Sequence, residues 1–231
     1  MTSLPFVFLP GFLCDERLWH FQTTAISSFS STKVVDLRHC KDLDEMVEAV
    51  AQSPWNKFNL VGFSMGGYVA QAFATKFPER IESLFLVATS GGTLSDFEVK
   101  SRSRMETILA NARYKGISEK ELRRYIHPDS WEKPEIKEII YAMSAANTSE
   151  MYLNQMRATL HRQDFKTALQ KLSFPLTIVG GQEDRVVTVD EIQSFHQAVP
   201  RSRLHLLSPC GHYVPLEMPE ALLEILTAPN P

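Results

Sequence analysis

The stretch NLVGFSMGGYVAQAFATKFP, residues 59–78, decides the fold class. Its apolar start ends in the segment GFSMG, residues 62–66, and an alanine-rich pattern with helical spacing follows. We therefore expect a buried strand, a sharp turn and a helix, with Ser64 on the turn. A serine in this position is expected to have a strained backbone, and Gly62 and Gly66 remove the β-carbons that would clash there.

Short apolar runs with helical patterns between them recur along the chain. Consecutive apolar residues are typical of strands that are buried on both faces of a parallel sheet. Pairs such as Asp42 with Glu45 and Thr188 with Glu191 fit capping boxes at helix starts. The alternation predicts an α/β fold in three layers, with helices on both sides of a mostly parallel sheet. The expected strands are residues 5–10, 33–37, 58–63, 83–89, 175–181 and 203–208.

Residues 93–171 break the alternation, because they carry helical patterns and no convincing strand. We interpret them as a helical insertion, with Ser118 and Glu121 capping one of its helices. Residues 1–92 and 172–231 then form the α/β core. The insertion has 14 Lys and Arg against 11 Asp and Glu, whereas the remainder has 10 against 16. Solvated helix faces explain this difference more simply than a binding role does.

Composition excludes several classes of function. A net charge of -3 gives no electrostatic case for nucleic-acid binding. No apolar run approaches the roughly 18 residues that span a bilayer, and the N-terminal segment suits a first strand better than a signal peptide. The three cysteines, Cys14, Cys40 and Cys210, are scattered along the chain. They indicate that the protein has no disulfide framework and belongs to the reducing cytoplasm. Neither a CxxC nor an HExxH pattern is present, so we expect no metal site.

The predicted turn gives Ser64 the position of a nucleophile. The amide of Met65, in the first turn of the helix, points at the same space and is expected to be half of an oxyanion hole. A serine hydroxyl needs a base, and His212 follows the last predicted strand on a glycine- and proline-containing loop. We expect surface or packing roles for the other histidines: His20, His39, His127, His161, His196 and His205.

The carboxylate that orients the histidine should follow the penultimate strand. Asp184 is favoured over its neighbour Glu183, while Asp190 is expected to complement the dipole of the next helix. After the first strand, a glycine turn aims the amide of Phe12 at Ser64, as the second oxyanion donor. The aromatic side chains of Phe12, Phe63 and Trp19 suggest an apolar pocket wall, although plain core packing is the more frequent role.

Four segments together resemble the α/β-hydrolase superfamily: GFSMGG (62–67), GGQEDRVV (180–187), CGHYVPLEMPE (210–220) and LPGFLCDERLW (9–19). The resemblance implies a Ser64–His212–Asp184 triad, no cofactor, and a helical cap after the sixth strand of the fold, where residues 93–171 lie. Two departures stand out. The usual first two strands are missing, and Pro10 replaces the common histidine before Gly11.

The resemblance implies a serine hydrolase that cleaves a carboxylic ester or thioester of a small molecule through an acyl-enzyme. Carboxylesterases, acyl-carrier methyl-ester esterases, enol-lactonases and the lyase of menaquinone synthesis all share the pattern, as do small-molecule receptors built on the fold. The less favoured interpretation of the basic insertion, a binding role, would suit an acidic substrate or an acyl carrier protein; the arginines concerned are Arg102, Arg104, Arg113, Arg123 and Arg124. The sequence does not determine acyl length, leaving group or oligomeric state.

Overall fold

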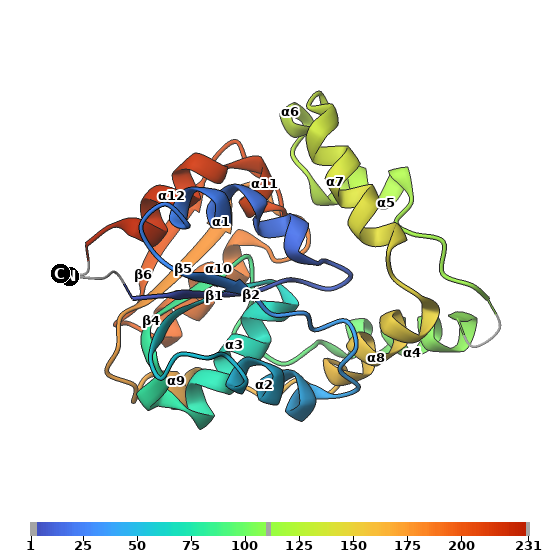
Figure 1. The fold of residues 1–231 in the computed structure, drawn as a ribbon. Helices are drawn as coiled ribbons and strands as arrows, with labels where there is room; N and C mark the ends of the chain where they lie inside the picture. Colours follow the sequence, from blue (N-terminus) through green and yellow to red (C-terminus); the bar gives the residue numbers. More distant parts are fainter. Residues whose placement is uncertain (1–3, 110–111, 230–231) are drawn as a thin grey trace.

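The computed structural model describes residues 4–109 and 112–229. Its centre is a six-stranded sheet with the order β2-β1-β3-β4-β5-β6, in which every neighbouring pair is parallel (Figure 1). The α/β class and the parallel sheet are therefore as predicted. The strands are β1 (Phe6–Leu9), β2 (Thr32–Val34), β3 (Phe58–Phe63), β4 (Ile81–Val87), β5 (Leu176–Gly181) and β6 (Arg203–Leu207).

Burial of the strands follows their place in the sheet. Every residue of β1 and β5 is buried, whereas β2 and β6 at the two edges are only partly buried along their whole length. Apolar side chains on consecutive residues suit the inner strands, because both of their faces are covered by helices. The expected strand at residues 83–89 was misplaced: β4 ends at Val87 because Ala88 turns the backbone with a φ of 47°.

Helices cover both faces of the sheet (Figure 1). On one face α2, α3, α9 and α10 enclose a core that includes Phe58, Phe73 and Phe195. On the other face η1, α1, α11 and α12 enclose a second core with Phe8 and Trp19. These helices are α2 (Leu43–Ala51), α3 (Met65–Lys76), α9 (Lys166–Leu169), α10 (Val189–Ala198), η1 (Glu16–Trp19), α1 (His20–Ile26), α11 (Val214–Glu217) and α12 (Pro219–Thr227).

The described residues between β4 and β5 form helices and connecting loops, without a strand. In Figure 1, α5, α6 and α7 stand away from the sheet, while α4 and α8 lie closer to it. Residues 110 and 111 of the expected insertion lie outside the described residues, and its boundaries at 93 and 171 stay a prediction. Its helices are α4 (Asp96–Leu109), α5 (Glu119–Tyr125), α6 (Pro128–Trp131), α7 (Pro134–Ala145), α8 (Ser149–Ala158) and the short α9.

Helix starts match the expected capping pairs, with one difference. Ser118 is the N-cap of α5 and Thr188 is the N-cap of α10, each with a complete capping box. Asp42 caps α2 through the amide of Glu45, but the Glu45 carboxylate accepts from the amide of Lys41 instead of Asp42. Among the described residues, none of the helices has the length and apolar character needed to cross a bilayer.

Candidate active site

Ser64 lies at the junction where β3 ends and α3 begins. Its backbone has φ 51° and ψ -113°, a left-handed conformation that a side chain rarely adopts, so the expected strain is present. The chain can approach so closely here because two glycines leave room: a β-carbon on Gly62 would lie 2.5 Å from the carbonyl oxygen of Gly66. The turn presents the Ser64 hydroxyl at the carboxyl end of the parallel sheet, where sites of α/β proteins are built.

His212 lies beside Ser64, on the loop after β6. Its Nε2 is 3.1 Å from Ser64 Oγ, within hydrogen-bond distance. The ring packs against that of Phe63 with centroids 5.0 Å apart, and the His212 amide donates to the carbonyl oxygen of Tyr125 at 2.7 Å. Both contacts hold the imidazole in place, so that it can accept the hydroxyl proton of Ser64.

Asp184 completes the row of hydrogen bonds. Its Oδ2 is 2.7 Å from His212 Nδ1, and its Oδ1 accepts the amides of Val186 and Val187 at 2.7 and 3.0 Å. The carboxylate is almost fully buried and its orientation is set by these amides. Such an arrangement fixes the tautomer of His212 that leaves Nε2 free to accept a proton.

The rival carboxylate, Glu183, serves a different purpose. It accepts from the Ser208 hydroxyl and from the Cys210 amide, both at 2.8 Å. Burial acts to raise the pKa of Glu183, but these hydrogen bonds outweigh it and the pKa lies below its usual value. Glu183 therefore ties the start of the histidine loop to the end of β5, and Asp184 is the carboxylate that contacts His212.

Phe12 and Met65, the two expected oxyanion donors, both line the cavity that contains Ser64. Within the described parts of the chain, neither amide has an intramolecular acceptor. The turn that contains Phe12 is held by two side chains from the region 93–171. The amide of Leu13 donates to Gln155 Oε1 at 2.9 Å, and the Leu13 carbonyl oxygen accepts from Asn147 Nδ2 at 3.0 Å. The roles of Gln155 and Asn147 were not predicted, because no local sequence pattern indicates contacts between residues more than a hundred positions apart.

Glu217 organises the histidine loop and was also missed. Its carboxylate is buried; Oε2 accepts the amides of His127 and Gly211 at 2.7 and 3.1 Å, and Oε1 accepts that of Tyr213 at 2.9 Å. Because two of these amides flank His212, Glu217 sets the path of the loop. Its place five residues after His212 was the available signal, but a carboxylate beside two prolines has many ordinary roles.

Two cysteines near the site are not competing nucleophiles. Burial raises the pKa of the Cys14 thiol to about 12 and raises that of Cys210 still further above its usual value. Both thiols are therefore protonated near neutral pH, and a protonated thiol is a poor nucleophile. Ser64, with its histidine partner, is the better candidate for attack.

A cavity of about 360 Å³ opens beside Ser64 and His212, in the size range of small-molecule sites. Phe12 and Phe63 line this cavity. Trp19 does not, and the expectation for it is corrected. Its side chain is fully buried in the core, with its ring 5.0 Å from that of Phe8. The helical pattern around Trp19 could not show which face of η1 meets the sheet.

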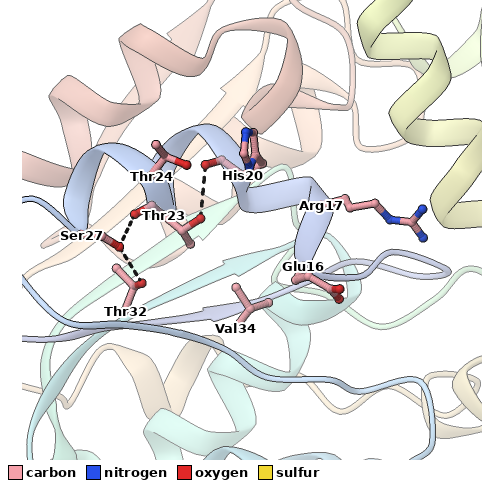
Figure 2. A pocket seen from close by; sticks show the side chains of 8 residues that line it. All are labelled: Glu16, Arg17, His20, Thr23, Thr24, Ser27, Thr32 and Val34. Atoms are coloured by element: carbon pink, nitrogen blue, oxygen red, sulfur yellow. Dashed lines mark hydrogen bonds between the residues drawn. The ribbon is translucent and has the colours of Figure 1, made fainter.

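A second hollow, of about 590 Å³, lies over η1, α1 and β2, away from the triad (Figure 2). Its polar side chains bond to one another and to the helix: Ser27 Oγ donates to the Thr23 carbonyl oxygen at 2.6 Å and lies 3.3 Å from Thr32 Oγ1. The Arg17 side chain points away from it (Figure 2). The hollow brings together no nucleophile and base, and we assign it no chemistry.

Comparison with known proteins gives the site a context. The family model described as "alpha/beta hydrolase fold" matches residues 9–219. A pimeloyl-[acyl-carrier protein] methyl ester esterase of Nitrosomonas europaea is 24% identical, over 96% of this chain and 94% of the relative.

Solved structures agree. A thermophilic esterase from Thermogutta terrifontis superimposes with a TM-score of 0.86 at 25% identity, covering 97% of this chain and 88% of the esterase. The enol-lactonase from Burkholderia xenovorans LB400 has a TM-score of 0.79 at 18% identity, covering 97% and 90%. At that identity, the second match speaks for the fold alone.

Proposed function

This chain belongs to the α/β-hydrolase fold family, and from that membership we propose that it is a serine hydrolase acting through an acyl-enzyme. Its substrate is a carboxylic ester or thioester of a small molecule. The observation that carries the proposal is the continuous row of hydrogen bonds from Ser64 Oγ to His212 and on to Asp184, at 3.1 and 2.7 Å. The named esterases among its relatives support the same class of reaction.

The proposed reaction begins when Ser64 Oγ attacks the ester carbonyl carbon while His212 Nε2 takes the hydroxyl proton. Asp184 holds the imidazole and stabilises the imidazolium that forms. The amides of Phe12 and Met65 bind the negative oxygen of the tetrahedral intermediate. His212 then gives its proton to the leaving alkoxide or thiolate. In the second half, water attacks the acyl-enzyme with His212 as base, which releases the acid and restores Ser64.

We also propose that residues 93–171 form a cap over the site. Gln155, Tyr125 and Arg102 lie in this region and contact or line the site. For the compartment we propose the cytoplasm, since the described cysteines are all free and buried. An acyl carrier protein stays a candidate partner, on the strength of the relative that acts on a carrier-bound ester.

Labelling and turnover test the proposal together. A fluorophosphonate probe should label the wild type at Ser64, and a panel of p-nitrophenyl esters of increasing acyl length should include substrates. Ser64→Ala should lose labelling and reduce turnover by roughly 10³-fold or more. Ser194→Ala, an exposed serine of α10, is the control that keeps both. An unchanged rate in Ser64→Ala would refute the proposed nucleophile.

Two other results would point to the alternatives. Mass spectrometry of a rapidly quenched reaction should find the acyl group on the peptide that contains Ser64. Turnover without that adduct, although the probe labels Ser64, would favour a mechanism without acylation of Ser64, such as that of the lyase. Labelling without turnover on any ester would favour a small-molecule receptor on the same fold.

A further inference from the structure

Two arginines line the cavity that contains Ser64: Arg102 on α4 and Arg162 in the loop after α8. A guanidinium is always charged at neutral pH, and a partly buried one normally finds a carboxylate partner. In the described ranges, neither Arg102 nor Arg162 forms an ion pair. Their positive charges therefore face the cavity without a direct carboxylate partner.

Arg162 is held in place by uncharged groups only. Its guanidinium lies 4.5 Å from the centre of the Tyr68 ring, and its Nη1 and Nη2 donate to the hydroxyl and carbonyl oxygens of Ser90 at 3.4 and 3.2 Å. Its Nε is buried and has no acceptor among the described residues. The side chain is therefore fixed, charged and incompletely hydrogen-bonded.

One side of the Arg102 guanidinium group has no hydrogen-bond partner among the described residues. Its Nη1 donates to both the carbonyl oxygen and the hydroxyl of Thr159, at 3.3 and 2.8 Å. No acceptor in the described structure contacts its Nε or Nη2. These two nitrogens form one side of the guanidinium fork, the side that binds the two oxygens of a carboxylate in parallel.

Three carboxylates also line the cavity, and each is already engaged at the start of its own helix. Glu98 accepts from Ser95, Glu121 from Ser118, and Glu191 from Thr188, in each case through a backbone amide and a hydroxyl at 2.6 to 2.9 Å. They therefore stabilise helix N-termini and leave the two guanidinium groups without a direct partner.

The pKa values of the two arginines show that their positive charges are unfavourable in this cavity. Burial lowers the pKa of Arg162, and the positive charge of Arg102 lowers it further, to about 10. Burial likewise lowers the pKa of Arg102. Both groups stay protonated near pH 7, and an anion that binds to a buried guanidinium offsets the cost of its desolvation.

We propose that Arg102 and Arg162 form a carboxylate-binding subsite in the cavity of Ser64. The substrate is then an ester or thioester that carries a free carboxylate on its acyl or alcohol part, such as the half-ester of a short dicarboxylic acid. This inference rests on the proposed function for the reaction itself, but the binding of a carboxylate does not depend on turnover.

Binding is tested first, in the Ser64→Ala background, by calorimetry with glutarate and with its neutral isostere glutaramide. Glutarate should bind at least tenfold more tightly, and Arg102→Gln should remove that difference. Arg104→Gln, an exposed arginine of the same helix that does not line the cavity, should preserve it. Equal binding of the two compounds, or no binding of either, would overturn the subsite.

Specificity is tested next, with monomethyl glutarate and methyl glutaramate as matched esters. The ratio of their kcat/KM values should favour the charged ester in the wild type and fall roughly tenfold to a hundredfold in Arg102→Gln. Arg162→Lys, which keeps a cation but loses the fork, should reduce the ratio as well. If both variants showed the same ratio of kcat/KM values as the wild type, the proposal would be contradicted.

The two tests separate this inference from the reaction. If the wild type hydrolyses neither ester and the fluorophosphonate does not label Ser64, but glutarate still binds through Arg102, the hydrolase proposal fails and the subsite stands. If p-nitrophenyl esters are cleaved through Ser64 while glutarate does not bind, the hydrolase stands and the subsite fails.

Discussion

Ser64 combines a reactive position with an unfavourable backbone. A side chain at φ 51° and ψ -113° costs on the order of 1–3 kcal/mol, and only tight packing around the turn keeps it there. The amide of Ser64 donates to the carbonyl oxygen of Val87 in β4 at 2.9 Å, which anchors the turn to the next strand. The strained backbone that positions the Ser64 hydroxyl therefore lowers the free energy of unfolding.

This strain predicts an unusual order of stability for two variants at position 64. Ser64→Gly should be at least as stable as Ser64→Ala, because glycine relieves the strain that alanine keeps. The measurement is urea unfolding followed by circular dichroism. On the exposed part of α7, Ala142→Gly is the control and should cost about 1 kcal/mol in the usual direction. A glycine variant at position 64 that is less stable by that same amount would show that the turn is not strained.

At the scale of elements, the strands and the loops differ in how far the sequence reveals them. Val61 and Leu84 lie in apolar runs that any parallel sheet requires, so β3 was predictable with both its ends and β4 apart from its ends. Ser64, Asp184 and His212 each follow a strand at the same edge of the sheet, which is why their approach could be expected. Gln155 and Glu217 could not be assigned roles, because their partners are backbone amides on other loops.

Glu217 gives the element scale its own prediction. Glu217→Gln should slow fluorophosphonate labelling of Ser64 by about tenfold and lower the free energy of unfolding by about 1–3 kcal/mol. An amide has one acceptor oxygen where the carboxylate offers two, so at least one of the amides of His127, Gly211 and Tyr213 loses its partner.

The control for this experiment is Glu220→Gln, which changes an exposed carboxylate on the neighbouring helix α12. It should alter neither the labelling rate nor the unfolding midpoint. A Glu217→Gln protein that is destabilised but labels at the wild-type rate would mean that the carboxylate supports the fold without positioning His212.

At the scale of the whole molecule, Asp15 and its two arginine partners link η1, the loop after β2 and helix α7. Its buried carboxylate accepts from Arg17 Nε at 2.9 Å and from Arg38 Nη1 at 3.4 Å, while Arg17 also donates to the Ala142 carbonyl oxygen of α7 at 3.1 Å. Burial acts to raise the pKa of Asp15, but the hydrogen bonds and charges of the two arginines outweigh it and lower the pKa below its usual value.

The lowered pKa predicts a pH-dependent contribution to stability. The stabilisation by ionised Asp15 is present above the unfolded carboxyl pKa of about 3.9, and it is lost as the pH falls through that value toward the lower folded pKa. Asp15→Asn keeps a capping oxygen for η1 and removes the charge. It should lower the free energy of unfolding by about 1–3 kcal/mol at pH 7, and by less at pH 4.

Urea unfolding of both proteins at the two pH values gives the measurement, with Glu132→Gln, an exposed carboxylate, as the control. The gap between wild type and Asp15→Asn should narrow on acidification, whereas the control should stay close to wild type at both values. A gap that is constant, or that widens at low pH, would contradict the assigned direction of the pKa.

The contact between the Tyr125 carbonyl oxygen and the His212 amide, at 2.7 Å, limits how this protein can be re-engineered. This bond and the one from the His127 amide to Glu217 are both made by the main chain, so a graft that exchanges residues 93–171 for the corresponding region of another hydrolase keeps them only if its backbone follows the same path. Chimaeras whose backbone departs from that path should lose the alignment of His212 along with the original specificity. Grafts that retain residues 125–127 should tolerate new sequences elsewhere in the region, which makes this short segment the natural junction for recombination.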